Sequence, residues 1–245
     1  MIERDPSTES RIPAELLRES VIVRDALQRL ASQGKRDFSD VEALALDRTA
    51  LIDSRLDAIT VLMAMQENRA DILPELLDSN DRMLVIETLK SIRNVGTEWA
   101  IPDLIVRMKS CSDPSKRAVF AWALGAYPKN ADVQNALLKV MVRDPDLAVR
   151  DHAIESLSEF RSPTVLDALL GALERGSASE RFWALYSLGT LADSRASEAI
   201  ARCLHDQTVI PDFGTVADEA RWALEQIARN TRKGPEVEDP GSNGN

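Results

Sequence analysis

The chain has 245 residues and 44% of them are hydrophobic, which is enough to bury a core and excludes a disordered composition. Only 4% are aromatic, and the abundance of Ala and Leu favours helices. The formal net charge of −10 opposes general binding to nucleic acid or to anionic lipid. The chain begins MIERDPSTES, without an apolar leader, and no stretch is apolar enough to span a membrane, so we expect a cytoplasmic protein.

The first predicted helices form a cap. Apolar residues recur at helical spacing in residues 14–33, and residues 38–52 are apolar enough for a second helix. We predict that residues 14–52 close one end of a single repeat domain, which spans residues 14–230 and has its repeats at 53–228.

One pattern then recurs along the chain: an Arg followed by apolar residues three, four and seven positions later, which is one face of a helix. The last copy has Ala in place of the Arg. We call the first residue of each copy the anchor, and the helices that follow the A helices. The anchors are Arg55, Arg82, Arg117, Arg150, Arg181 and Ala220. They are 27, 35, 33, 31 and 39 residues apart, a period typical of stacked helical repeats.

A second apolar face follows each A helix except the last and predicts a B helix. The predicted B helices cover residues 73–77, 101–108, 133–140, 165–172 and 196–203. The Asp-Pro pairs at 113 and 144 predict N-caps, and Gly96, Gly125 and Gly189 predict C-caps. A helix pair of this size buries its apolar face only against its neighbours. We therefore predict an all-α fold, an α-α superhelix of about five to six helix pairs in a HEAT-like solenoid.

Two segments depart from the repeat. The loop at 205–217 is longer than its counterparts, and it is either a tolerated insertion or a functional loop. Residues 231–245 are polar and rich in Gly and Pro, so we predict a disordered tail.

The repeat resembles a known family. Residues 144–173 (DPDLAVRDHAIESLSEFRSPTVLDALLGAL) and 179–204 (SERFWALYSLGTLADSRASEAIARCL) are similar to HEAT-like repeats of the phycobilisome-lyase type, and the resemblance extends over about residues 50–228. It implies the fold, whereas scaffolds, lyase subunits and hydroxylases with such repeats differ in function.

Signatures of catalysis are missing from the sequence. It contains no Gly-rich phosphate loop and no GxSxG motif. The two histidines, His152 and His205, exclude the repeated His-Glu pairs that hold iron in the HEAT-like deoxyhypusine hydroxylases. Cys111 and Cys203 belong to no CxxC pair. We expect neither an enzyme nor a bound cofactor or metal.

The first candidate binding surface is a set of charge columns on the B helices. One column is acidic or polar and the other, one turn later, is basic. The columns comprise Glu75, Asp103, Asn135, Asp167 and Glu198, and Arg107, Lys139 and Arg202. Because B helices line the concave face of HEAT solenoids, the columns are either a groove for a charged peptide or a solvated face with i,i+4 ion pairs.

The second candidate surface is aromatic. His152, Trp183 and Trp222 stand two positions after their anchors, and Trp122 and Tyr186 stand five positions after theirs. Both positions lie beside the core stripe, so these residues are either packed between repeats or exposed as a recognition strip.

These patterns favour a non-catalytic interaction scaffold that binds a partner protein or peptide, and the net charge leads us to expect a basic partner. A chromophore-lyase-like accessory subunit and an inhibitor or immunity-type protein that masks a basic partner are the alternatives. We expect a monomer.

Overall fold

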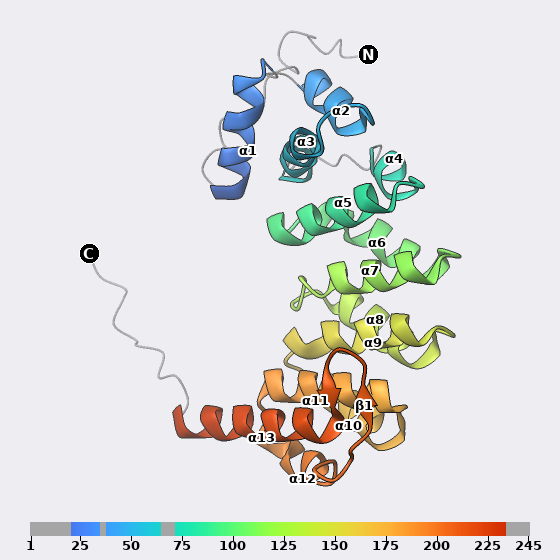
Figure 1. The fold of residues 1–245 in the computed structure, drawn as a ribbon, viewed down its shortest axis with the longest axis vertical. Helices are drawn as coiled ribbons and strands as arrows, with labels where there is room; N and C mark the ends of the chain where they lie inside the picture. Colours follow the sequence, from blue (N-terminus) through green and yellow to red (C-terminus); the bar gives the residue numbers. More distant parts are fainter. Residues whose placement is uncertain (1–20, 35–37, 65–71, 234–245) are drawn as a thin grey trace, which may run out of the picture. The chain divides into compact units, whose positions relative to one another are not determined.

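The computed structural model describes residues 21–34, 38–64 and 72–233. The chain divides into two compact units, Met1–Tyr127 and Pro128–Asn245, and each is described by itself. Within the described residues both units are built from helix pairs (Figure 1).

The N-terminal unit contains three A helices that pack in sequence order, α3 on α5 and α5 on α7, with the B helices α4 and α6 against α5 and α7. The helices α1 and α2 pack on α3. The elements are α1 (Val21–Ser32), α2 (Phe38–Leu46), α3 (Ile52–Ala64), α4 (Leu73–Leu77), α5 (Arg82–Val95), the 3-10 turn Glu98–Ala100, α6 (Ile101–Ser110) and α7 (Pro114–Leu124).

The C-terminal unit repeats the arrangement with two rows of helices. The A helices α9, α11 and α13 form one row, and the B helices α8, α10 and α12 form the other. A two-stranded antiparallel hairpin precedes α13. The elements are α8 (Ala131–Arg143), α9 (Leu147–Ser156), α10 (Pro163–Arg175), α11 (Ala178–Leu191), α12 (Ser197–Ala201), β1 (Val209–Ile210), β2 (Gly214–Thr215) and α13 (Val216–Lys233), with 3-10 turns at Leu157–Glu159 and Ser194–Ala196.

The predicted all-α repeat fold is confirmed: the predicted A and B patterns coincide with helices, although the last B helix, predicted over residues 196–203, is only α12 (Ser197–Ala201). The core consists of the predicted apolar positions, with side chains such as Leu89, Leu104, Phe120, Leu169 and Leu188 removed from solvent.

Several boundaries differ from the predictions. Gly189 lies inside α11, and the left-handed C-cap is Ala192. Asp146 rather than Asp144 caps α9. The helix α13 extends three residues into the segment predicted to be a tail, to Lys233. The tail from 234 onward, and residues 14–20 of the predicted cap, lie outside the described residues, and the single-domain boundary of 14–230 stays a prediction.

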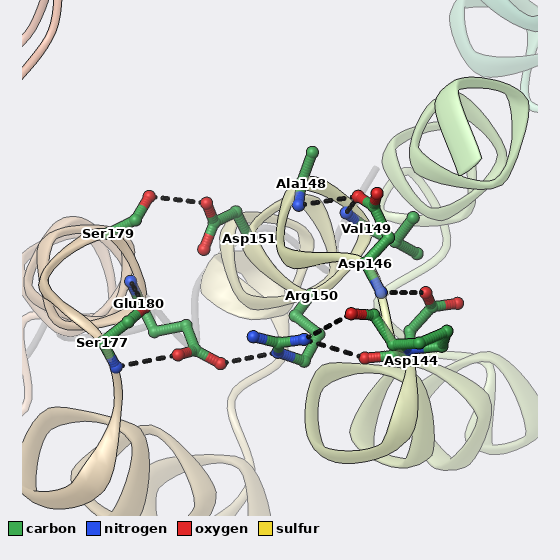
Figure 2. Close-up of polar contacts among 10 residues, drawn as sticks. Asp144, Asp146, Ala148, Val149, Arg150, Asp151, Ser177, Ser179 and Glu180 are labelled. Atoms are coloured by element: carbon green, nitrogen blue, oxygen red, sulfur yellow. Dashed lines mark hydrogen bonds and ion pairs between the residues drawn. The ribbon is translucent and has the colours of Figure 1, made fainter.

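The anchor Arg connects successive segments of the repeat. In Figure 2, the Arg150 guanidinium donates to the carbonyl oxygens of Asp144 (2.9 Å) and Pro145 (3.3 Å), which follow α8, and to the Glu180 carboxylate of α11 (2.8 Å). Arg117 likewise donates to the carbonyl oxygen of Cys111 (2.9 Å), after α6. Carbonyls at a helix C-terminus lack partners within the helix, so the anchor supplies donors that the repeat needs.

Figure 2 also shows a hydrogen bond from Ser179 of α11 to the Asp151 carboxylate of α9 (2.5 Å). Burial raises the pKa of Asp151 despite this bond. The A helices α9 and α11 are thus joined at their N-terminal ends by two neighbouring polar contacts, one from Arg150 and one from Ser179.

A glycine allows α13 to approach α11 closely. A Cβ atom on Gly189 would lie 2.5 Å from the Trp222 ring and 2.9 Å from the Ala223 Cα, closer than packed atoms approach. The Trp222 side chain therefore occupies the space that any other residue at position 189 would fill.

Replacing the anchor tests its structural role. Arg150→Ala leaves two loop carbonyls and the Glu180 carboxylate without their donor, and we expect the free energy of unfolding to fall by roughly 2 kcal/mol. Chemical denaturation with detection by circular dichroism measures it. Arg229→Ala is the control because Arg229 is an exposed partner in an i,i+4 pair on α13. Equal effects of the two substitutions would contradict the role of the anchor.

Two helix-interior glycines provide a matched test of close packing. Gly189→Ala should destabilise the protein by about 1 to 3 kcal/mol because backbone and a packed indole must move. In Gly171→Ala only the flexible end of the Arg175 side chain must move, and Ala favours a helix more than Gly, so stability should hold or rise. Thermal unfolding compares the two; a tolerated Gly189→Ala would refute the close approach.

Candidate functional site

The rings of five aromatic residues form one connected group in the C-terminal unit, which we call the aromatic cluster. Tyr186 and Trp222 stack with their ring centroids 5.6 Å apart and their planes at 7°. Trp183 meets Tyr186 edge-on at 5.9 Å, and Phe213 lies 5.2 Å from Trp183. Phe182 contacts both Trp183 (5.6 Å) and Phe213 (5.8 Å). The cluster joins α11, the hairpin and α13.

The hairpin presents Phe213 to solvent. It turns through Asp212 and Gly214, both at positive φ, with Phe213 between them. Phe213 is 58% exposed although its ring lies on the cluster. The Trp183, Tyr186 and Trp222 side chains are partly exposed beside it, so the cluster is a surface feature with a buried base.

Asp206 fixes the base of the hairpin to α11. Its carboxylate accepts from the Thr208 hydroxyl (2.6 Å) and amide (3.1 Å), and from the Arg181 guanidinium (2.6 Å). The hydrogen bond from Thr208, with the help of Arg181, lowers the pKa of Asp206, so the carboxylate is ionised at neutral pH. This ion pair holds the start of the inserted loop against α11, next to Trp183.

Glu219 is a half-buried carboxylate next to the cluster. It precedes Trp222 by one turn on the same side of α13. Within the described residues Glu219 has no hydrogen bond or ion pair. Burial alone raises the pKa of Glu219 to about 7.

Glu180 occupies the same repeat position as Glu219 but has a partner. Glu180 stands one position before its anchor and accepts from Arg150, the anchor of the preceding A helix. Glu219 stands one position before Ala220, so Arg181 is its corresponding donor. Arg181 binds Asp206 instead (2.6 Å). Arg150 and Arg181 thus differ in their carboxylate partner: Arg150 binds the residue before the next anchor, and Arg181 binds the inserted loop.

Comparison with protein families identifies the repeats. A model described as HEAT repeats matches residues 101–189 and 135–225, which together are more than half of the chain. The chain belongs to the HEAT-repeat family. The match is to the repeat itself, so the resemblance to the phycobilisome-lyase type stays a prediction.

The other comparisons add little about function. No curated protein matches the chain. Among solved structures, a designed armadillo repeat protein is similar, with 16% sequence identity over 84% of this chain and 90% of that chain, at a TM-score of 0.43. None of the described helices is long and apolar enough to cross a membrane.

The aromatic residues predicted from the HEAT repeat are only partly brought together. Trp183, Tyr186 and Trp222 belong to the cluster. His152 lies 3.1 Å from the Glu155 carboxylate on its own helix and has no ring contact with them. Trp122 belongs to the N-terminal unit, where the Arg93 guanidinium lies 4.7 Å from the centroid of its ring.

Sequence reasoning did not single out Phe213, Phe182 and Glu219. The signal for Phe213 was the long loop at 205–217, which carries an aromatic residue near its centre. Phe182 is buried and directly precedes Trp183, so its pattern is that of a core residue. Glu219 could have been found by comparing the position before each anchor.

Most members of the predicted charge columns are exposed, whereas the Arg107 side chain is only 13% exposed and is paired. Arg107 binds Asp103 on its own helix and Asp78, at the C-terminus of α4. Arg202 binds Glu198 (2.6 Å), and both side chains are mostly exposed. Exposed pairs of this kind contribute little to stability.

The remaining members of the columns in the C-terminal unit are the exposed side chains of Asn135, Lys139 and Asp167. They lie on α8 and α10, which contact each other, while α10 contacts α12. The described contacts therefore support the solvated-face interpretation for the paired members and leave a groove as a prediction.

Glu219 should make stability depend on pH. Because its pKa is about 7 in the folded chain, above the ordinary value of 4.5, the folded state holds the proton more tightly. Stability from this group is present at low pH and is lost as the pH rises through about 7. Glu219→Gln should match wild type near pH 4, where the carboxyl is protonated in both the folded and the unfolded chain, and should exceed it at pH 8. The difference at pH 8 should be on the order of 1 kcal/mol and no larger, because solvent screens a half-buried charge. Unfolding of both proteins across this range measures the difference; Glu225→Gln, an exposed change on the same helix, should show none.

Proposed function

We propose that the chain is a non-catalytic scaffold that binds a partner protein through the aromatic cluster of its C-terminal unit. The observation that carries the proposal is the placement of Phe213. An aromatic side chain that is 58% exposed rests on the buried Phe182 ring and the partly exposed Trp183 ring, and the Asp206–Arg181 ion pair holds the start of its loop to α11. Large aromatic side chains that lie on a rigid base are typical of the residues that dominate binding energy at interfaces.

The net charge supports a basic partner. A charge of −10 attracts cationic surfaces and increases their rate of encounter, whatever the details of the contact. An inhibitor or immunity-type role, in which the chain masks a basic protein, would use the same surface. The charge columns are the alternative surface for either role.

Affinity capture with matched variants tests the proposal. The full chain is immobilised, exposed to a lysate of its native host, and the bound proteins are quantified by mass spectrometry. We expect one stoichiometric partner. Phe213→Ser should lower the amount of captured partner at least about tenfold, which corresponds to the loss of one interface hot spot. Val142→Ser is the control because Val142 is 71% exposed and lies on α8, outside the cluster.

A third variant separates the two candidate surfaces. Lys139→Glu combined with Arg202→Glu reverses the basic column of the C-terminal unit and leaves the cluster intact. Partner binding that survives Phe213→Ser but is lost in this double variant would transfer the function to the charge columns. Binding that survives both would contradict the proposal.

A further inference from the structure

We propose that the aromatic cluster and the Glu219 carboxylate together form a binding site for one cationic side chain, Arg or Lys, of the partner protein. This inference rests on the proposed function and names the chemistry of the residue that the same surface takes.

The first argument is that the rings lack a cation. The faces of Trp and Tyr rings attract cations through their quadrupole. In the N-terminal unit the chain itself provides the cation for such a ring. The Arg93 guanidinium lies over the Trp122 ring and also donates to the Trp122 carbonyl oxygen (2.7 Å). Trp122 and Tyr186 both stand five positions after their anchors, so the two units can be compared directly.

The corresponding cation of the C-terminal unit is directed elsewhere. Arg93 and Arg161 both stand eleven positions after the preceding anchor. Arg161 donates to the Leu191 carbonyl oxygen (3.1 Å) rather than covering Tyr186. In the part of the chain that the structure describes, no cation of the chain lies over Trp183, Tyr186 or Trp222.

The second argument is the unpaired carboxylate. The ring contacts place Phe213 over Trp183 and Trp222 against Tyr186. Glu219 follows the hairpin and precedes Trp222 by one turn, so the two residues are neighbours on the same side of α13. The corresponding Glu180 is paired with the anchor Arg150, whereas the anchor Arg181 is paired with Asp206 and the Glu219 side chain has no partner among the described residues.

Together these features match the requirements of a cation and of little else. An anion would be repelled by Glu219, and a purely apolar side chain would bury that carboxylate further without a donor. A guanidinium or ammonium group can donate to the carboxylate while its face or methylene groups rest on the rings. The half-buried position of Glu219 reduces the screening of that attraction by solvent.

The site can be tested with defined probes. The full chain, labelled with ¹⁵N, is titrated with blocked Gly-Arg-Gly and Gly-Lys-Gly peptides, and with Gly-citrulline-Gly, which keeps the shape of Arg without its charge. The readout is the chemical shift of the indole N–H groups of Trp183 and Trp222, at a pH of about 8 so that Glu219 is ionised. We expect both cationic peptides to shift these signals at millimolar concentration and the citrulline peptide not to.

Matched variants identify the carboxylate. Glu219→Gln should weaken binding of the Arg peptide about tenfold, the equivalent of one charge-assisted contact. Glu225→Gln removes an exposed carboxylate from the same helix and should leave the affinity unchanged. Folding of both variants is verified from the dispersion of their amide spectra.

Three results would overturn the inference: equal shifts with the Arg and citrulline peptides, no shift with either cationic peptide, or an unchanged affinity in Glu219→Gln. The partner-capture experiment keeps the two proposals separate. If Phe213→Ser loses the partner and Glu219→Gln retains it, the scaffold function stands and the cation site is wrong. If both variants retain the partner, the cluster is not the binding surface at all.

Discussion

The hydrogen bonds of the anchors Arg117, Arg150 and Arg181 to the loop before each A helix are the interaction that ties together the repeats that contain them. Arg150 joins the end of one B helix, its own A helix and the first turn of the next A helix, through carbonyl oxygens and the Glu180 carboxylate. A stack of helix pairs buries apolar area equally well over a range of small rotations, because that attraction has no direction. The planar guanidinium group does have direction, and it selects one relative position of neighbouring repeats.

The inserted hairpin changes this interaction at one place. Its first carboxylate, Asp206, binds Arg181, the anchor of α11, whereas the preceding anchor, Arg150, binds Glu180 at the start of the next A helix. Two features of the surface accompany the binding of Arg181 to Asp206. The hairpin is held against α11 with Phe213 resting on Trp183, and Glu219 remains next to the rings without a donor. The aromatic surface and the unpaired charge therefore occur together at the inserted hairpin.

The sequence predicts the helices well because their signal is local. The spacing after Arg55, Arg117 and Arg150 reports a buried helix face, and each of these faces is buried in the structure. Gly189 was misinterpreted as a cap because its actual constraint, the Trp222 ring of another helix, is distant in sequence. The site was partly predictable for the same reason: register placed Trp183, Tyr186 and Trp222 on related faces, whereas the contact of Phe213 with Trp183 depends on the path of a hairpin that no periodicity describes.

The aromatic cluster also lowers the folding stability of the unbound chain. An exposed Phe213 keeps apolar area in water, and a half-buried Glu219 loses hydration without gaining a hydrogen bond. Natural sequences generally retain such local costs where function requires them. A cationic side chain that covers Phe213 and donates to Glu219 would reverse both at once, so the free energy that folding loses at this surface is recovered as binding energy. The same residues that weaken the free protein would in this way favour its complex.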